Sequence, residues 1–162
     1  MKRLFTPRLS ALTAAAAAAA AVMASAPAYA AGTVQVKFVE PDKFADVRGM
    51  HQRVDDGLLK ILEAHFQTAA AQYVPDGQTL SIEVLDVDLA GEFRSRFSAS
   101  PDVRVLGLGA DSPHIKLRYA LSSPSGAAQL EEVRLSDLGY LYRGTGRYSS
   151  SESLRFEKRM ID

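Results

Sequence analysis

The sequence has 162 residues, with 19 basic and 19 acidic side chains and no cysteine. A chain of this length forms one ordinary domain with a buried core. The lack of cysteine excludes disulfides, cysteine-ligated zinc, thiol catalysis and a lipid anchor on cysteine. The balanced charge argues against a nucleic-acid binder that relies on a strongly positive surface.

The first 30 residues have the pattern of a cleavable secretory signal. Three basic side chains come before an almost wholly apolar stretch at residues 9–23. Ala28 and Ala30 supply the small side chains that signal peptidase requires, so we expect cleavage after Ala30. The apolar stretch is too short for a membrane anchor, because a spanning helix needs about 20 residues. We therefore expect a soluble exported product without a transmembrane anchor.

Cleavage would leave residues 31–162, which we expect to form a single domain. These 132 residues carry 16 basic and 19 acidic side chains, a net charge of −3. The acidic balance and the exported location both disfavour nucleic acid as a partner.

The first elements of this domain are predicted from hydrophobic periodicity. Residues 33–39 alternate between apolar and polar, which indicates a half-buried strand that ends before Pro41. Apolar residues then recur at spacings of three and four over residues 53–73, which predicts an amphipathic helix of about 20 residues. Pro-Asp-Gly at residues 75–77 predicts the turn that ends it.

Strands dominate the next part of the sequence. Residues 79–89 predict a strand whose buried phase switches after Val84, which indicates a β-bulge or burial on both faces. A short strand is predicted at residues 103–106. Alternating residues at 114–121 and 129–135 flank a Ser- and Pro-rich turn and predict a β-hairpin.

A short helix is predicted from Ser151 to the end of the sequence. The order of elements is therefore strand, helix, strand, short strand, hairpin, helix. This order predicts a single α+β domain with a mostly antiparallel sheet, the long helix packed on one face and a short C-terminal helix.

A set of short motifs, in this order, resembles one protein family. The motifs are FVEPDKF at 38–44, DVR at 46–48, DVDLAGE at 86–92, DVRV at 102–105, PHIKLRY at 113–119, LSDL at 135–138 and LRFEKRM at 154–160. The set is similar to an exported proteobacterial family catalogued as domain of unknown function 3016. The resemblance implies a signal peptide and one domain, with no established activity, ligand or partner. Members usually continue with an aromatic pair beyond the last helix, so we expect that helix to be shortened here and less firmly docked.

Asp86, Asp88 and Glu92 are the first candidate site. The two aspartates are two residues apart at a strand end, so their side chains point to the same face. Three carboxylates in this arrangement could hold a hard cation such as Ca²⁺ or Mg²⁺, or form an acid–base pair with one raised pKa. We favour the simpler interpretation, in which a strand leaving the sheet exposes its acids or pairs them with arginines.

Two Asp-Val-Arg triplets make Arg48 and Arg104 the second pair of candidates. Two converging arginines would bind a small anionic ligand. We favour local ion pairs within each triplet, Asp46 with Arg48 and Asp102 with Arg104, which contribute at most about 1 kcal/mol each if exposed.

Other residues give weaker signals. His51, His65 and His114 are scattered and form no known metal-binding motif. The basic region at residues 143–159, with its interleaved tyrosines, could contact an anionic lipid headgroup, a glycan or a protein. A solvated helix face and a tyrosine-rich edge of the core explain it more simply.

The sequence predicts no catalytic residue, no metal site and no cofactor, and we rank a non-catalytic periplasmic binding or accessory module first. One alternative is a carboxylate-dependent hydrolase or metal binder centred on Asp86, Asp88 and Glu92. Another is an envelope-assembly subunit, which requires an exposed apolar patch or a bare sheet edge. The candidate partners are an envelope protein and a small anionic ligand. The deciding question is whether the three acids converge with Arg48 and Arg104.

Overall fold

The structure of the protein is a computed structural model. It describes residues 31–48, 53–93, 104–107, 112–122, 126, 130–144 and 146–162. The predicted signal and its cleavage site, as well as His51 and Asp102, lie outside these residues.

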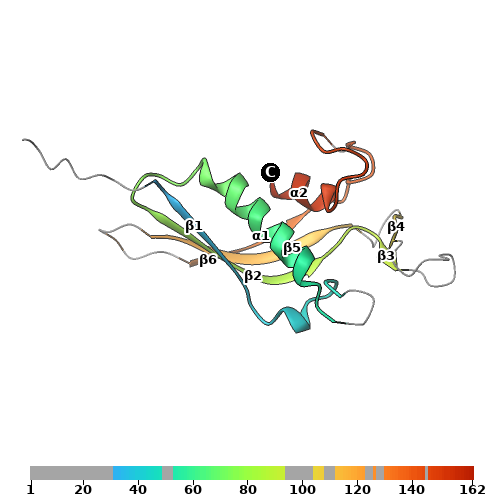
Figure 1. Cartoon of the computed structure of the whole chain (residues 1–162), viewed down its shortest axis with the longest axis horizontal. Coiled ribbons are helices and arrows are strands. Elements are labelled where there is room, and N and C mark those ends of the chain that lie inside the picture. The colour runs from blue at the N-terminus through green and yellow to red at the C-terminus, as the bar shows by residue number, and fades with distance from the viewer. Residues whose placement is uncertain are drawn as a thin grey trace, which may run out of the picture.

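A four-stranded sheet is the framework of the fold. Its strands are Thr33–Phe38 (β1), Thr79–Asp88 (β2), His114–Ser122 (β5) and Leu130–Ser136 (β6), and they lie in the order β1-β2-β5-β6 (Figure 1). β1 and β2 are parallel, whereas β2 with β5 and β5 with β6 are antiparallel. The predicted α+β class, mostly antiparallel sheet and C-terminal hairpin are therefore confirmed.

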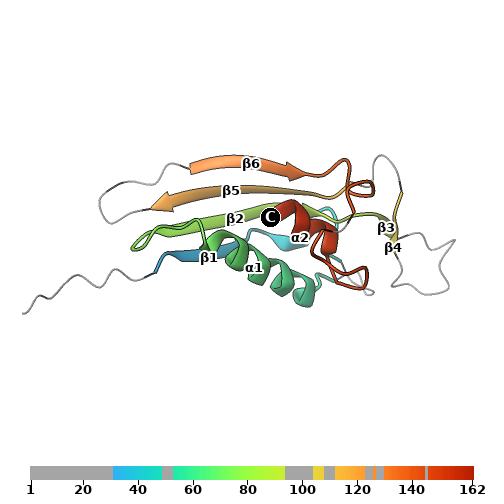
Figure 2. The ribbon, with the colours of Figure 1, turned by 90° about the horizontal axis from the view of Figure 1, so that it is seen from above.

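The crossover between the two parallel strands is the helix α1, Asp56–Ala71. It is shorter than predicted because Asp55 caps it: the side chain accepts hydrogen bonds from the backbone N–H of Gly57 (2.9 Å) and Leu58 (3.1 Å). The buried side chains of α1 recur at helical spacing, at Leu59, Leu62 and Phe66. This stripe packs on one face of the sheet (Figure 2).

A β-bulge at Leu85 sets which residues of β2 face the helix. Val84 pairs with Leu117 and Asp86 pairs with Lys116, so the partner strand has no residue opposite Leu85. Val84 before the bulge and Val87 after it are both fully buried. The switch of phase predicted from the sequence is therefore this bulge.

The core lies between the sheet and α1. It is built from apolar side chains of the helix, the two central strands and the segment after β1. Its buried members include Phe44, Val47, Leu59, Leu62, Phe66, Ile82, Val84, Val87, Ile115 and Leu117.

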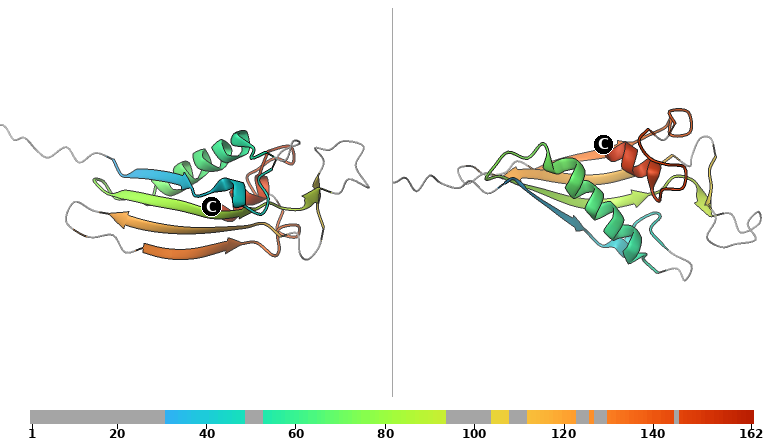
Figure 3. Two further views of the ribbon diagram at one scale, coloured as in Figure 1. Left: turned by 90° about the horizontal axis from the view of Figure 1, so that it is seen from below. Right: turned by 45° about the horizontal axis from the view of Figure 1, so that its top comes forward.

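The opposite face of the sheet carries charged side chains. One row across all four strands is Lys37, Glu83, Arg118 and Glu132, in which opposite charges alternate. Arg118 donates a hydrogen bond to Glu83 in this row. Neither α1 nor the C-terminal helix lies in front of the strands on this side (Figure 3, left).

The C-terminal helix α2, Arg155–Ile161, packs against α1. It begins later than predicted, because Leu154 adopts a left-handed backbone with φ of 56° and breaks the helix. Glu152 lies before this break, in a turn in which its N–H donates to the carbonyl of Ser149. α2 buries both Phe156 and Glu157, so the expectation that this helix is less firmly docked is wrong.

Beyond the end of β2 the chain forms a small ribbon, Glu92–Phe93 (β3) paired with Arg104–Val105 (β4). Gly91 makes the turn into it with φ of 74°. A side chain at this position would place its Cβ 2.5 Å from the carbonyl oxygen of Val105. Glycine is therefore required here both by the left-handed backbone and by the close approach of β4.

Candidate functional site

The end of β2 brings three of the five predicted residues together. Asp86 and Asp88 share one face of β2, as their spacing predicted, and Arg104 approaches the same strand end from β4. Asp46 and His114 complete the cluster through contacts with Arg104 and Asp88. The convergence is therefore partial, and it includes two residues outside the predicted set.

Asp86 binds backbone N–H groups in this cluster. Its Oδ1 accepts hydrogen bonds from the N–H of Ala45 (2.8 Å) and from the N–H of Val87 (3.0 Å). The first bond ties the segment after β1 to β2 beside the bulge. Asp86 thus satisfies backbone groups that would otherwise lack partners.

Arg104 is engaged by groups of the protein itself. Its guanidinium donates to the carboxylate of Asp46, and its Nε donates to the carbonyl of Ala90 at 3.0 Å. It also donates to the carbonyls of Leu89 and Gly91. These four bonds hold the β3–β4 ribbon against β2 and do not support a role in anion binding.

Local pairing within the Asp-Val-Arg triplets, as predicted, is wrong for Asp46. Asp46 pairs with Arg104, which is 58 residues away in the sequence. Arg48 instead donates to the backbone carbonyl of Asp42 at 2.8 Å. The two candidate arginines therefore serve separate partners and do not form one anion site.

Asp88 has the most perturbed carboxyl group of the cluster. Its Oδ2 lies 3.5 Å from Nδ1 of His114. Burial raises the pKa of Asp88 above its ordinary value; His114 opposes this rise, and the negative charges of Asp46 and Asp86 add to it. The pair is partly exposed on the charged face of the sheet.

Glu92 is at the start of β3, after the turn at Gly91. It is exposed, and its backbone pairs with Val105 of β4. Within the described residues, no group of three or more His, Asp or Glu side chains is arranged to hold a metal ion. The predicted set of Asp86, Asp88 and Glu92 is thus not a three-carboxylate cation site in this structure.

A cavity lies on the other face of the sheet, where α1 and α2 end. Its volume is about 450 Å³. It is lined by Phe66, Ala69, Ala70, Gln72, Tyr73, Arg147, Ile161 and Asp162. The alanines at the end of α1 leave this space because their side chains are too short to fill it.

A hydrogen-bonded network forms one wall of this cavity. Asp162 accepts a bond from Arg147 (2.7 Å) at Oδ1 and a bond from the hydroxyl of Tyr148 (2.6 Å) at Oδ2. Nε2 of His65 lies 3.0 Å from the same carboxylate and 3.1 Å from the carbonyl of Lys158. Both of these oxygens are acceptors, so we assign a proton to Nε2 and donation from His65 to them.

Burial is the main cause of a raised pKa at Tyr148, and the bond to Asp162 adds to the rise while Arg147 opposes it. The Tyr148 hydroxyl therefore stays protonated and serves as a donor. The network ties the C-terminal helix, through Asp162, to α1, through His65. Its donors also neutralise the charge of Asp162 at the edge of the cavity.

The sequence analysis did not single out this cavity. His65 is three residues after the buried Leu62, and Arg147 and Tyr148 are in a Gly- and Ser-rich stretch. The interleaving of arginine with tyrosine was the available signal. Most other basic groups in that region have structural partners: Lys158 pairs with Glu152 at 2.7 Å, and Arg159 donates to Asp137.

A smaller cavity of about 190 Å³ lies between the end of β2 and the start of α2. Arg104 and the buried Glu157 both line it. Glu157 accepts a 2.7 Å bond from the N–H of Ala90, which fixes α2 to the strand end. Both charged groups are thus used to hold the fold.

A family model described as a protein of unknown function, DUF3016, covers residues 32–162. The chain belongs to this family. No curated protein and no solved structure matches it. Neither helix in the described part of the chain has the length and apolar character needed to cross a bilayer.

Proposed function

We propose that this DUF3016 chain is an exported, non-catalytic binding module, which holds a small anionic ligand with an apolar part in the cavity between α1 and α2. The observation that carries this proposal is that apolar side chains and the largely exposed Arg147 line one cavity. A volume of about 450 Å³ is within the range of ligand sites in proteins.

The floor of the cavity suits the apolar part of such a ligand. Phe66, Ala70 and Ile161 line it, and the buried Phe66 belongs to the hydrophobic core, so the floor is rigid. Tyr73 stands at the rim with 75% of its surface exposed. Its ring is therefore available to stack on a bound aromatic or planar group.

Arg147 is placed to bind the anionic part of such a ligand. Its side chain is 69% exposed although one amino group bonds to Asp162. Asp162 accepts bonds from Arg147, Tyr148 and His65, so it repels an incoming anion less than a free carboxylate would. Arg147 is therefore the proposed anion-binding residue, whereas the sequence suggested Arg48 and Arg104 for this role.

The carboxylate-dependent alternative has less support. Asp86 is occupied by two backbone N–H groups, and Arg104 is occupied by Asp46 and by backbone carbonyls. Asp88 and His114 form a partly exposed pair, and they line neither of the two cavities described above.

The proposal can be tested with 8-anilinonaphthalene-1-sulfonate, a fluorescent probe that combines aromatic rings with one anionic group. We expect saturable binding to the purified protein. Tyr73→Ala and Arg147→Gln should each weaken it about tenfold, because each removes a main contact. Fluorescence titration measures this directly.

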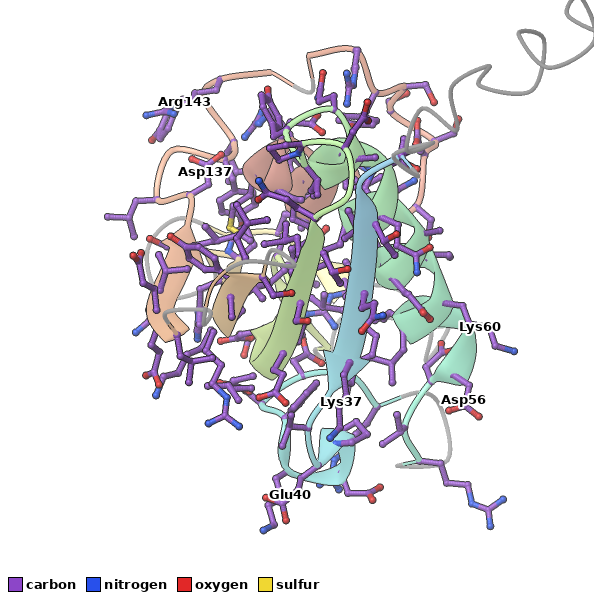
Figure 4. The ribbon with its side chains drawn as sticks, turned by 90° about the vertical axis from the view of Figure 1, so that its left-hand side faces the viewer. Lys37, Glu40, Asp56, Lys60, Asp137 and Arg143 are labelled. Atoms are coloured by element: carbon purple, nitrogen blue, oxygen red, sulfur yellow. The ribbon has the colours of Figure 1, made fainter. Side chains whose placement is uncertain are left out.

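The matched controls are Tyr142→Ala and Arg143→Gln. Tyr142 is 78% exposed, about as much as Tyr73, and Arg143 is exposed and points outward (Figure 4). Neither residue lines the cavity. Equal losses in the lining and control variants, or no saturable binding by the native protein, would contradict the proposal.

A further inference from the structure

Strand β6 forms one margin of the sheet and is exposed along most of its length. In the described part of the chain it pairs with β5 on one side only. Leu130 and Val133 are exposed to 60% and 37%, and the pairing with β5 runs without a register shift. The strand has no proline or bulge, two of the features that protect a sheet edge from further pairing, and its charged side chains are Glu131, Glu132 and Arg134.

Within the described residues, no strand pairs with the outer side of β6. Figures 2 and 4 show it at the margin opposite β1, and α1 lies over the β1 side of the sheet. The backbone groups on the outer side of a marginal strand can pair with a further strand. A bare sheet edge was the feature that the sequence analysis required of an assembly subunit.

The charges of β6 are complementary to those of a second β6. Glu132 bonds to Lys116 at 2.8 Å, and Glu131 accepts a 2.6 Å bond from the hydroxyl of Tyr119. Arg134 has no hydrogen bond or ion pair with any residue that the structure describes. It is therefore an exposed cation on the outer strand with no acid of its own.

A two-fold axis perpendicular to the sheet keeps the helices of both copies on one side, and it pairs residues that share a face. With this axis at Val133, Glu132 of each copy is opposite Arg134 of the other, and the two Val133 side chains meet at the centre. Moving the axis to Glu132 or to Arg134 sets like charges directly opposite each other. The axis at Val133 also pairs the strand over its whole length, Leu130–Ser136.

We propose that this protein forms a symmetric homodimer by antiparallel pairing of β6 with β6 of a second copy, centred on Val133. The sheet then continues through both copies as eight strands. One strand pair is a small interface, so the dimer forms reversibly and its population rises with concentration. The interface is on a different part of the molecule from the proposed cavity and does not depend on it.

Charge reversal tests the pairing. Glu132→Arg places two arginine pairs across the axis, and Arg134→Glu places two glutamate pairs there. Each single variant should shift the dimer midpoint at least about tenfold upward in concentration. Sedimentation velocity from about 10 µM to about 1 mM measures this for the purified protein. Circular dichroism checks that each variant is folded.

Two further experiments restore charge complementarity across the axis and make the test specific. The double variant Glu132→Arg/Arg134→Glu should dimerise like the native protein, because it exchanges the two charges without losing complementarity. A mixture of the two single variants should form a heterodimer, since each then faces the opposite charge. The control Lys37→Glu reverses an exposed charge on β1, at the other margin (Figure 4), and should leave dimerisation unchanged.

A native protein that stays monomeric up to about 1 mM overturns the proposal. So does a dimer that the two single reversals leave intact, or a mixture of the two that stays monomeric. Equal loss on Lys37→Glu also overturns it, because the association would then depend on general charge.

Discussion

At the scale of single residues, two aspartates of the same strand have different roles. Asp86 and Asp88 share one face of β2, which the two-residue period of a strand predicts. Asp86 holds two backbone N–H groups, whereas Asp88 faces the imidazole of His114 and has a raised pKa. The difference arises from their surroundings, because Ala45 approaches only the first of them.

The raised pKa of Asp88 predicts how stability depends on pH. The folded state binds this proton more tightly than the unfolded chain, so the group costs stability at neutral pH. That cost disappears as the pH falls through the folded pKa toward the ordinary value of 3.8. Asp88→Asn should therefore raise the free energy of unfolding at pH 7.5, by at most about 1 kcal/mol because the side chain is partly exposed.

Urea unfolding at pH 7.5 and near pH 4 measures this difference. The gain from Asp88→Asn should shrink at the lower pH. Asp76→Asn is the control, since Asp76 is exposed in a turn where asparagine is equally acceptable. A variant less stable than the native protein at pH 7.5, or a gain that does not change with pH, would contradict the assignment.

At the scale of elements, periodicity predicted the strands of the main sheet, the long helix and the bulge of β2. It did not predict the pairing of Asp46 with Arg104, because contacts 58 residues apart leave no periodic signal. The start of α2 was missed for a related reason. Its left-handed residue is Leu154, and leucine rarely adopts that backbone, so the sequence gives no warning of it.

The turn from β2 into β3 gives a prediction at this scale. Gly91→Ala should lower the free energy of unfolding by at least about 2 kcal/mol, because it combines a left-handed backbone with a clash 2.5 Å from the Val105 carbonyl. Gly144→Ala is the matched control: φ there is 66° and nothing lies within 4 Å of the added carbon. It should cost only about 1 kcal/mol.

Urea unfolding of both variants separates the cost of the left-handed backbone from the cost of the clash with Val105. Equal losses would mean that the approach of β4 to Gly91 contributes nothing. A larger loss for Gly144→Ala would contradict the account of how the ribbon is held.

At the scale of the whole molecule, the sheet separates two different surfaces. One face carries both helices, the core and the larger cavity, and the other carries rows of alternating charge. The sequence predicted this layered arrangement because apolar residues alternate along the strands. The cavity could not be predicted, since it depends on how closely the ends of two helices approach.

Export is the second claim at this scale, and it rests on the first 30 residues. The protein from the periplasm should begin at Ala31, and intact-mass spectrometry measures this. Ala30→Leu should block cleavage at this position, because signal peptidase requires a small side chain there, whereas Ala31→Leu should not. A native protein that retains Met1 would contradict export with cleavage.

The central claim is that ligand binding occurs between α1 and α2. Its most direct test is a titration of the isotopically labelled protein with 8-anilinonaphthalene-1-sulfonate, followed by the shifts of backbone amide resonances. The account predicts saturable shifts concentrated at residues 66–73, at Arg147 and at residues 161–162. Shifts centred on Asp86, Asp88 and His114, on the opposite face of the sheet, would contradict it.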